Sequence, residues 1–543
     1  MTALLAMMTA LVISISLTPL MIRLAPRMRM VDLPDPRKVH LTPIPRVGGL
    51  GIAVGTLIAM VLFVPIDSIV GWYLFGAAVL LVFGAADDSM ELGHWVKFVG
   101  QFIAVIPIVH FGDLWVTTLP VFDIALSPWI GKPFTVIAIV GVINAINHSD
   151  GLDGLASGEA LMSFAAIAYL GFLAGDGQCL AIAAAAAGGI LGFLRFNTHP
   201  ARVFMGDAGS QFIGYTLGVM VVLLTQKVNP ALSMAIPALL LGLPIVDIIA
   251  VFAQRIHGGM NWFKASRNHI HHRLLAIGFQ HYQAVLIIYT VQAVMVVNAV
   301  NLAYESDLVI IGLYLALSAL VFIALIAAER TGWRADVAGR NWLILGILDS
   351  IHESKAVAVV PRWLVFVAVP AFMVVASFSV NELAVDSKVA LALVALLLVA
   401  YVSLRKKSYG EYLSRLAVYA LIPLLVWSGQ AGGLSEAAEY KPFTDVFFIA
   451  LGICVLLAAK FAADRDQFAP NTMDFLLLLF VVVAGFVLSS GEETTARLGS
   501  LLIQVVVLFY GCEVIMRISR AGAHLLSAAT AASLVIIALR AAG

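Results

Sequence analysis

Long apolar segments recur from one end of the chain to the other, separated by short polar connections. An α-helix rises 1.5 Å per residue, so about 20 apolar residues cross the hydrocarbon core of a bilayer. Only helices and closed barrels satisfy their backbone hydrogen bonds there. We therefore predict an all-α fold, a polytopic membrane helical bundle of about 18 transmembrane helices. The spans are expected near residues 2–24, 48–66, 68–86, 97–112, 133–147, 158–174, 178–196, 209–226, 231–252, 282–301, 307–328, 363–381, 386–404, 414–430, 443–460, 474–490, 497–516 and 523–541.

The composition excludes a water-soluble globular domain. Of the 543 residues, 62% are hydrophobic and only 12% are charged, whereas a soluble domain carries about 25% charged residues. The N-terminal apolar segment lacks a positive n-region and is long enough to span, so we expect a retained first helix rather than a signal peptide. Three isolated cysteines are predicted to be small packing residues, without metal-ligand or disulfide spacing. They are Cys179, Cys454 and Cys512.

A less hydrophobic stretch divides the chain into two predicted membrane domains. We place a first domain of about 11 spans at 1–330, a cytoplasmic or interfacial linker at 331–361, and an additional membrane domain of about 7 spans at 362–543. The second domain carries no clustered carboxylates or histidines. Membrane embedding is therefore all that its residues predict.

The lysines and arginines predict the orientation of the first eleven spans. Alternate connections carry thirteen of these residues, whereas the intervening connections carry only Lys132 and Lys227. Because positively charged loops remain in the cytoplasm, the first set is predicted to be cytoplasmic. Five polar clusters lie in or beside that set, which indicates one site at the cytoplasmic face. The connections predicted to be cytoplasmic are 23–47, 87–97, 148–157, 195–208 and 253–281.

The first polar cluster is an aspartate pair at the end of a span. Asp87 and Asp88 are adjacent carboxylates, which repel each other unless a cation or hydrogen-bond donors neutralise them. We interpret the pair as candidate metal ligands, with a solvated helix end as the alternative. Lys97 opens the next span, where its ammonium is placed to reach a phosphate; the alternative is an ordinary snorkelling lysine.

The segment INAINHSDGLDGLASG spaces its polar side chains by three. Asn144 and Asn147 share one face if the backbone is helical, as do Asp150 and Asp153. The glycines between them permit tight turns and close approach of a ligand. This arrangement suits a hydroxylated, metal-chelated ligand, and a plain acidic turn is the alternative.

Asp207 lies within GDAGS, directly before a span. Backbone amides at a helix start bind anions, and a carboxylate beside bound phosphate suits Mg²⁺. We predict Asp207 as a metal ligand, with an N-cap aspartate as the alternative.

Three histidines occupy FKASRNHIHHRLLAIG. His269, His271 and His272 are too closely spaced to supply three zinc ligands on one regular helix. Because Lys264 and Arg267 lie nearby, phosphate binding is favoured over a surface cluster without function.

The segment RKVHLTPIPRVGG is basic. Arg37, Lys38, His40 and Arg46 are suited to neutralise lipid headgroups or a phosphate substrate, and an orientation signal explains them equally well.

Asp247 lies inside a predicted span. A carboxylate there is functional or paired, and Arg255 is its candidate neutralising partner.

Taken in order, the motifs RKVH…PRVGG, ADD, NAINHSDGLDGL, N-x-x-P-A-R-V-F-M-G-D-A-G-S and HIHHRL resemble the polyprenyl-phosphate N-acetylhexosaminyl-1-phosphate transferases. The resemblance covers about the first 330 residues, and HIHHRL looks more like the GlcNAc-1-phosphate branch than the peptidoglycan branch. The seven further spans exceed those typical of the family.

The resemblance implies transfer of an N-acetylhexosamine-1-phosphate, with GlcNAc favoured, from a UDP-sugar to undecaprenyl or another polyprenyl phosphate. It implies Mg²⁺, or Mn²⁺ as an alternative, at Asp207 with Asp87 and Asp88 close to the diphosphate and acceptor phosphate. Whether an aspartate deprotonates the lipid phosphate or only orients it is left open. The implied nucleotide contacts are Asn147, Asp150, Asp153 and Phe204, and the implied phosphate contacts are Lys97, Asn197 and His269–His272.

The expected partners are a UDP-N-acetylhexosamine, the polyprenyl phosphate and the lipid bilayer, with no nucleic acid. A homodimer or later glycan-assembly enzymes are the candidate protein partners. We expect a multi-pass protein of the bacterial inner membrane whose active site faces the cytoplasm. The alternatives are a transporter, whose charges belong near the midplane in broken helices, a lipid-linked glycan flipping module, or a transferase using UDP-MurNAc-pentapeptide.

Overall fold

The described residues form two compact units, one up to Ala335 and one from Lys355 onwards. Among them, eleven helices are long and apolar enough to cross a membrane, and five shorter helices are also apolar. The chain is therefore an all-α, multi-pass membrane protein, as the apolar pattern predicts. The computed structural model describes residues 2–34, 42–121, 124–259, 268–335, 355–380, 395, 410–431, 441–460, 493–518 and 520–542.

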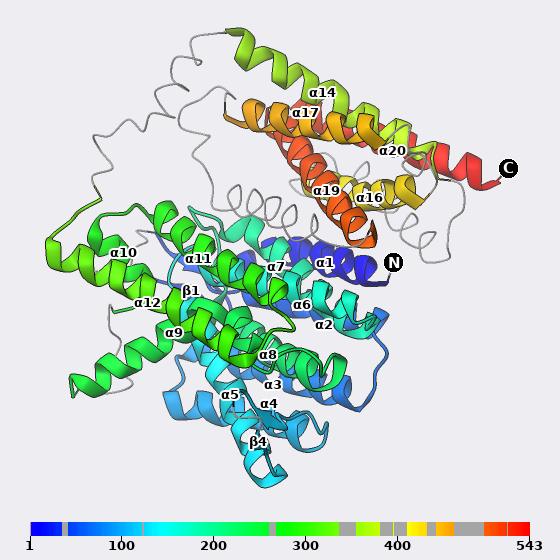
Figure 1. Ribbon diagram of the computed structural model, residues 1–543. Coiled ribbons are helices and arrows are strands. Elements are labelled where there is room, and N and C mark those ends of the chain that lie inside the picture. Colours follow the sequence, from blue (N-terminus) through cyan, green and yellow to red (C-terminus); the bar gives the residue numbers. More distant parts are fainter. Residues whose placement is uncertain are drawn as a thin grey trace. The chain divides into compact units, whose positions relative to one another are not determined.

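In the first unit, a helix coincides with each of the eleven spans predicted there (Figure 1). The element missed by the apolar pattern is the short α10, which is too short to span. The helices are α1 (Thr2–Leu24), α2 (Gly48–Phe63), α3 (Ser68–Met90), α4 (His94–His110), α5 (Pro128–Ser149), α6 (Leu155–Leu173), α7 (Gly177–Asn197), α8 (Gly206–Leu223, continued by the π-helix η1, Leu224–Val228), α9 (Ile236–His257), α10 (Ile270–Ile277), α11 (His281–Asn301) and α12 (Asp307–Thr331).

Two short antiparallel hairpins accompany these helices. In one hairpin, β1 (Val31–Asp32) pairs with β2 (Ile44–Pro45) between α1 and α2. In the other, β3 (Thr118–Leu119) pairs with β4 (Ile124–Ala125) between α4 and α5. Each strand has two residues, so the hairpins shape connections and leave the fold all-α.

Helix α8 is the centre of the first unit. The most apolar part of its span is entirely buried, and α2, α3 and α5 all pack against it. A Cβ at Gly84 of α3 would overlap the backbone of Ala208, and one at Gly49 of α2 would overlap the backbone of Gly209. Glycine at both positions therefore lets two helices contact the first turn of α8 at backbone distance.

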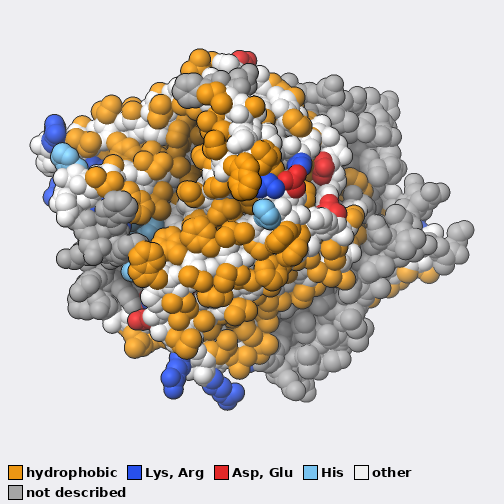
Figure 2. All heavy atoms as spheres, turned by 90° about the horizontal axis from the view of Figure 1, so that it is seen from below, with side chains coloured by type: hydrophobic (Ala, Val, Ile, Leu, Met, Phe, Trp, Pro, Cys, Tyr) orange, Lys and Arg blue, Asp and Glu red, His pale blue; other side chains and the backbone are white. Residues whose placement is uncertain are grey.

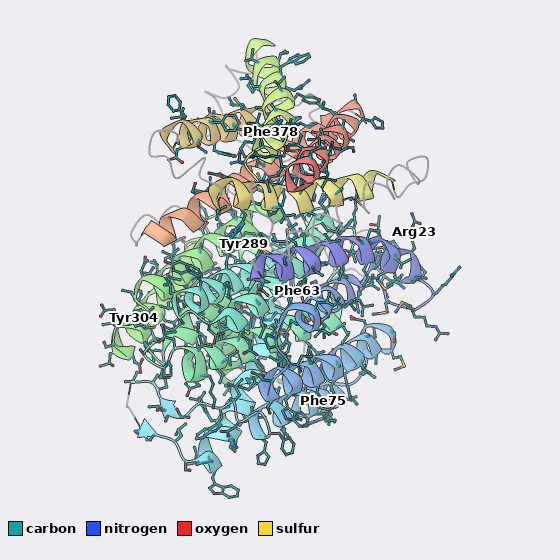
Figure 3. The ribbon with its side chains drawn as sticks, turned by 90° about the vertical axis from the view of Figure 1, so that its right-hand side faces the viewer. Arg23, Phe63, Phe75, Tyr289, Tyr304 and Phe378 are labelled. Atoms are coloured by element: carbon teal, nitrogen blue, oxygen red, sulfur yellow. The ribbon has the colours of Figure 1, made fainter. Side chains whose placement is uncertain are left out.

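The outer helices present apolar side chains where a lipid environment is expected. Trp95 of α4 is 75% exposed, Trp129 of α5 is 88% exposed and Val82 of α3 is 68% exposed. Figure 2 shows a face of the molecule covered mostly by hydrophobic side chains. Arg23 in the last turn of α1 and Tyr304 between α11 and α12 lie at opposite sides of this unit (Figure 3). Their assignment to opposite faces of the membrane stays a prediction.

Helix α9 is interrupted at Gly242, which adopts φ 49° and ψ −127°. Buried side chains from other helices satisfy the backbone groups released by the break. Gln292 Oε1 accepts the N–H of Leu243 at 3.0 Å, and its Nε2 donates to the Leu240 carbonyl at 3.3 Å. The Tyr314 hydroxyl donates to the Gly242 carbonyl at 3.2 Å. The second half of α9 is thus held in a direction of its own.

The second unit is a helical bundle whose helices bury a shared apolar core. Ser533 of α20 donates to the Met373 carbonyl of α14 at 2.9 Å, and Tyr419 of α16 donates to Glu513 of α19. The predicted spans at 386–404 and 474–490 fall almost entirely outside the described residues, and the proposed domain roles stay predictions. The helices are α14 (Lys355–Ser377), α16 (Gly410–Ala431), α17 (Lys441–Lys460), α19 (Glu493–Ile518) and α20 (Arg520–Ala542).

We expect Gln292→Leu to destabilise the first unit, because the N–H of Leu243 would be left buried without an acceptor. The expected cost is about 1–3 kcal/mol, measured as a lower thermal unfolding temperature in detergent. Thr290→Val on the exposed side of α11 is the matched control. Equal unfolding temperatures for both variants would show that the side chain does not support the break in α9.

Candidate active site

Asp88, near the end of α3, binds the start of α8. Its Oδ1 accepts the backbone N–H of Asp207 at 2.8 Å, and its Oδ2 accepts the N–H of Ala208 at 3.0 Å. The side chain is buried, with 4% of the residue exposed, so the solvated-end alternative is wrong. The alternative in which Asp207 is itself an N-cap is also wrong, because Asp207 lies in the first turn of α8 and Asp88 accepts these amides from a different helix.

Asp87 and Asp207 share the ammonium of Lys97. Lys97 Nζ lies 2.5 Å from Asp87 Oδ2 and 3.0 Å from Asp207 Oδ2. The other oxygen of Asp87, Oδ1, is buried without a hydrogen-bond partner in the described structure. Two carboxylates with one ammonium leave an excess negative charge at this point, which favours a further cation.

Asparagine side chains of α5 complete this cluster. Asn147 Nδ2 donates to Asp207 Oδ1 at 2.5 Å and to Ser210 Oγ at 2.8 Å. Asn144 Nδ2 donates to Gln101 Oε1 at 2.9 Å, one turn deeper in the bundle. Gln101 in turn reaches Gln211 Oε1 at 3.4 Å. The helical spacing predicted for the two asparagines is confirmed, and Asn147 is the one that contacts Asp207.

The aspartates at 150 and 153 depart from the helical spacing considered for them. The chain turns at Gly151 and again at Gly154, which has φ 79° and directly precedes α6. Asp150 and Asp153 therefore lie on a turn rather than on one helix face. Burial, followed by the negative charges of Asp207 and Asp153, raises the pKa of Asp150 from 3.8 to about 7.

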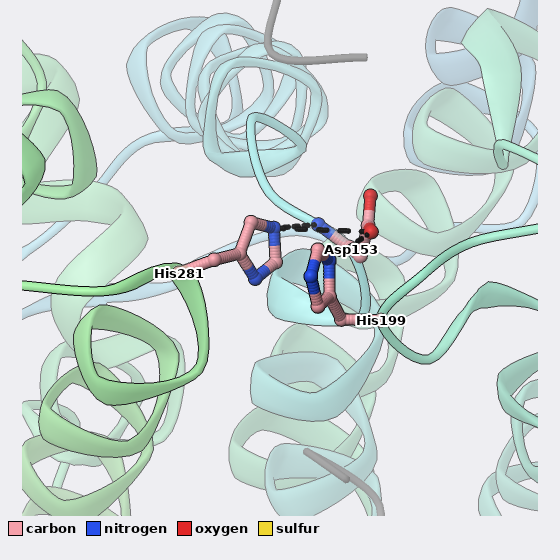
Figure 4. Close-up of side chains that lie close together, drawn as sticks. All are labelled: Asp153, His199 and His281. Atoms are coloured by element: carbon pink, nitrogen blue, oxygen red, sulfur yellow. Dashed lines mark hydrogen bonds and ion pairs between the residues drawn. The ribbon is translucent and has the colours of Figure 1, made fainter. Parts of the chain in front are cut away.

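Asp153 also contacts two histidines that the sequence motifs did not single out (Figure 4). Its Oδ2 accepts from His199 Nδ1 at 2.8 Å, and its backbone N–H donates to His281 Nε2 at 3.1 Å. These three residues carry metal-ligand atoms close together. The two imidazole rings, however, stack with centroids 4.1 Å apart and planes only 21° apart. An imidazole lone pair lies in the ring plane, and one ion cannot lie in the planes of two stacked rings. The two histidines are therefore not arranged to bind the same ion, and both contact Asp153 in the 150–153 turn.

The histidine motif folds onto the same turn. His269 and His271 are buried, at 6% and 3% exposed, so the alternative of a surface cluster is wrong for them. His271 lies against Gly151, where a Cβ would overlap its ring. His272 contacts His271 with centroids 4.2 Å apart. Burial, followed by the charges of His272, His269 and His281, holds the pKa of His271 well below 6.5.

Asp247 is paired with this motif. Its Oδ2 accepts from His269 Nδ1 at 2.7 Å, and its Oδ1 accepts the N–H of Ile270 at 2.9 Å. The intramembrane carboxylate is therefore paired, as expected, and its observed partner is His269 of the histidine motif.

The segment from 197 to 205 links the site to the basic hairpin. Asn197 Oδ1 accepts the N–H of Gly154 at 2.9 Å and its Nδ2 donates to the Val203 carbonyl at 2.8 Å. The backbone N–H of Phe204 donates to the Pro45 carbonyl at 2.8 Å, and its carbonyl accepts from Gly48 at 2.9 Å. Asn197 is thus buried and engaged in fixing two turns.

Arg46 of the basic segment forms an ion pair with Asp32 across the β1–β2 hairpin. Both residues line a cleft of about 550 Å³ that also reaches Asp88 and Arg29. The hairpin therefore places one predicted basic residue beside the start of α8. Four other predicted binding residues lie outside the described residues: Arg37, Lys38, His40 and Arg267.

The fold and the site together define a multi-pass membrane protein in which carboxylates, amides and imidazoles from distant segments meet at helix ends. A family model for glycosyl transferase family 4 matches residues 70–225. A Bacillus subtilis protein named "Probable undecaprenyl-phosphate N-acetylglucosaminyl 1-phosphate transferase" is 35% identical over 332 residues, which are 60% of this chain and 91% of that relative.

Two further relatives carry similar names. The undecaprenyl-phosphate alpha-N-acetylglucosaminyl 1-phosphate transferase of Escherichia coli is 31% identical over 329 residues, 58% of this chain and 87% of the relative. The decaprenyl-phosphate N-acetylglucosaminephosphotransferase of Mycobacterium leprae is 33% identical over 314 residues, 52% of this chain and 79% of the relative. The chain belongs to glycosyl transferase family 4, in the group of polyprenyl-phosphate N-acetylhexosaminyl-1-phosphate transferases.

We expect Asp150→Asn to stabilise the protein much more at about pH 8 than at about pH 5, because the carboxyl of Asp150 stays protonated in the fold up to a pKa of about 7. The unfolded group ionises near its ordinary value, so wild-type stability falls as the pH rises through this window. Thermal unfolding of both proteins in EDTA measures the difference.

Asp113→Asn is the control for this comparison. A hydrogen bond from Lys132 holds the pKa of Asp113 below its ordinary value, so its contribution is constant above about pH 5. A difference between wild type and Asp150→Asn that is the same at both pH values would contradict the assignment.

Proposed function

We propose that the protein transfers GlcNAc-1-phosphate from UDP-GlcNAc to a polyprenyl phosphate, such as undecaprenyl phosphate, and releases UMP. The observation that carries this proposal is the meeting of Asp87, Asp207 and Lys97 at one point, beside Asn147 and the 150–153 turn. The printed names of the relatives support the substrate class. Transfer of this phosphosugar would begin a cell-envelope glycan, such as lipopolysaccharide, on its lipid carrier.

The residues present fit a divalent cation. Asp87 offers a buried oxygen that has no hydrogen-bond partner among the described residues, and Asp207 faces it across the ammonium of Lys97. Hard oxygen ligands of this kind suit Mg²⁺, with Mn²⁺ as an alternative. We infer that Asp207 and Asp87 hold the ion. Asp88 lies beside them, and its two oxygens already accept the backbone amides of α8. When bound, the ion offsets the charge on the diphosphate and on the leaving UMP.

The reaction joins two anions, so its barrier is set largely by charge. An oxygen of the lipid phosphate attacks the β-phosphorus of the UDP-sugar, and the bond to the bridging oxygen of UMP breaks. Lys97 supplies a positive charge next to Asp87 and Asp207. His269, His271 and His272 lie around the 150–153 turn. A phosphate monoester has a second pKa of about 6, so the acceptor is largely dianionic at neutral pH. An aspartate that only orients the acceptor is therefore sufficient.

We propose that these groups face the cytoplasm of a bacterial inner membrane. The nucleotide sugar would enter from the cytoplasm while the tail of the acceptor stays in the bilayer. The distribution of lysines and arginines supports this orientation. The apolar exposure of α3, α4 and α5 supports contact with lipid on the same part of the molecule.

Asp207→Asn is expected to lower UMP release by at least about 100-fold, because the variant loses a metal-ligand charge worth several kcal/mol in the transition state. Purified protein, UDP-GlcNAc, undecaprenyl phosphate and Mg²⁺ provide the assay, and mass spectrometry of the lipid identifies the transferred sugar. Asp67→Asn, which alters the N-cap of α3, is the control with unchanged turnover. Turnover by Asp207→Asn equal to that of the control would show that Asp207 is not a ligand of the catalytic metal ion.

Lys97→Met is expected to lower the unfolding temperature in EDTA, because Asp87 and Asp207 would then face each other without a counter-charge. Added Mg²⁺ should raise the unfolding temperature of this variant more than that of wild type. Lys132→Met, which breaks the exposed pair with Asp113, is the matched control. A Mg²⁺ effect of the same size in both variants would speak against an ion between the two aspartates.

A further inference from the structure

The interrupted helix α9 delivers a buried carboxylate to the histidine motif. The break at Gly242 lies one turn before Asp247, and Gln292 fixes the backbone there. Asp247 is only 7% exposed. Its two oxygens bind two consecutive residues, His269 and Ile270, at the start of α10. The carboxylate therefore sets both the orientation of one imidazole and the position of a helix.

The consequence extends from α10 to the 150–153 turn. The ring of His269 stacks on His148 of α5 and on His271, with centroid separations of 5.5 and 5.7 Å. His271 in turn rests on Gly151. Asp247 thus lies at the base of a continuous stack that ends at the turn carrying Asp150 and Asp153. A shift of Asp247 would move the whole stack relative to that turn.

We propose that Asp247 is a positioning residue for the transfer reaction: its carboxylate holds His269 with Nδ1 protonated and anchors α10 against the catalytic turn. This inference rests on the proposed function. It assigns to Asp247 an action through His269, without contact to substrate. A carboxylate is needed because both of its contacts require an acceptor, and an amide offers only one acceptor oxygen.

Asp247→Asn separates the two contacts. The amide oxygen can still accept the N–H of Ile270, so α10 keeps its anchor. The amide nitrogen, however, can only donate, and it therefore selects the His269 tautomer with Nδ1 unprotonated. A similar exchange in serine proteases leaves the geometry intact while imposing the wrong tautomer.

The test is a double-mutant cycle with Asp247→Asn and His269→Ala in the full-length protein, assayed with UDP-GlcNAc and undecaprenyl phosphate. We expect Asp247→Asn alone to lower kcat by about ten-fold or more, with KM for UDP-GlcNAc within about three-fold of wild type. In the His269→Ala background, the same substitution should lower kcat by less than about two-fold, because its path of action is already removed. Equal losses in both backgrounds, or no loss in wild type, would overturn the proposal.

Asp307→Asn is the matched control. Asp307 accepts the backbone N–H groups of Val121 and Ala235 and is the first residue of α12. The contact of α12 with α10, between Glu329 and Arg273, lies in the last turn of α12. Substitution of Asp307 should lower the unfolding temperature and leave kcat unchanged. If Asp247→Asn does not fold, Asp247→Ser replaces it in the cycle, because its shorter, neutral side chain also removes the carboxylate from His269.

A spectroscopic measurement keeps this inference separate from the proposed function. In ¹⁵N-histidine NMR spectra, the signal lost in His269→Ala identifies His269. We expect Nδ1 to carry its proton in wild type and Nε2 to carry it in Asp247→Asn, whatever substrate the protein uses. An unchanged His269 signal in Asp247→Asn would overturn the positioning role. Absence of UMP release by wild type, with the tautomer change present, would instead refute the proposed function alone.

Discussion

The hydrogen bonds from the first amides of α8 to Asp88 are the constraint on which the site depends. They tie the end of α3 to the start of the most buried helix in the first unit. Backbone contact at Gly84 makes this approach sterically possible. Because Asp87 precedes Asp88 and Asp207 lies in the first turn of α8, one capping interaction brings together two carboxylates that are 120 residues apart in sequence. Lys97 then lies where it can neutralise part of their charge.

The sequence predicted the spans of the first unit well, because a lipid environment requires long apolar helices with few exceptions. It also predicted which polar segments belong together. It did not predict which partner each group would have: Asp88 was expected to act like Asp87, yet it caps α8, and Asp247 pairs with His269. Such pairings arise where two helices pack closely at a glycine, as at Gly84, or where a helix is interrupted, as at Gly242. Spacing along the chain carries no information about them.

His199 and His281 show the same limit. Each is a single histidine without a periodic partner, so no spacing pointed to either one. Both contact Asp153 because α7 ends, and α11 begins, close to the start of α6. In the second unit, the apolar pattern predicted helices and nothing more, and the described helices bury an apolar core. The family match at residues 70–225 lies entirely in the first unit.

Electron paramagnetic resonance of bound Mn²⁺ tests the central claim most directly, because it reports whether Asp87 and Asp207 hold an ion without requiring turnover. In lipid nanodiscs, wild type and Asp67→Asn should each immobilise one Mn²⁺ that Mg²⁺ displaces. Asp207→Asn should lose that ion, because one of the two carboxylates brought together at the start of α8 would be gone. Equal binding of Mn²⁺ by Asp207→Asn would contradict the account and place the cation elsewhere.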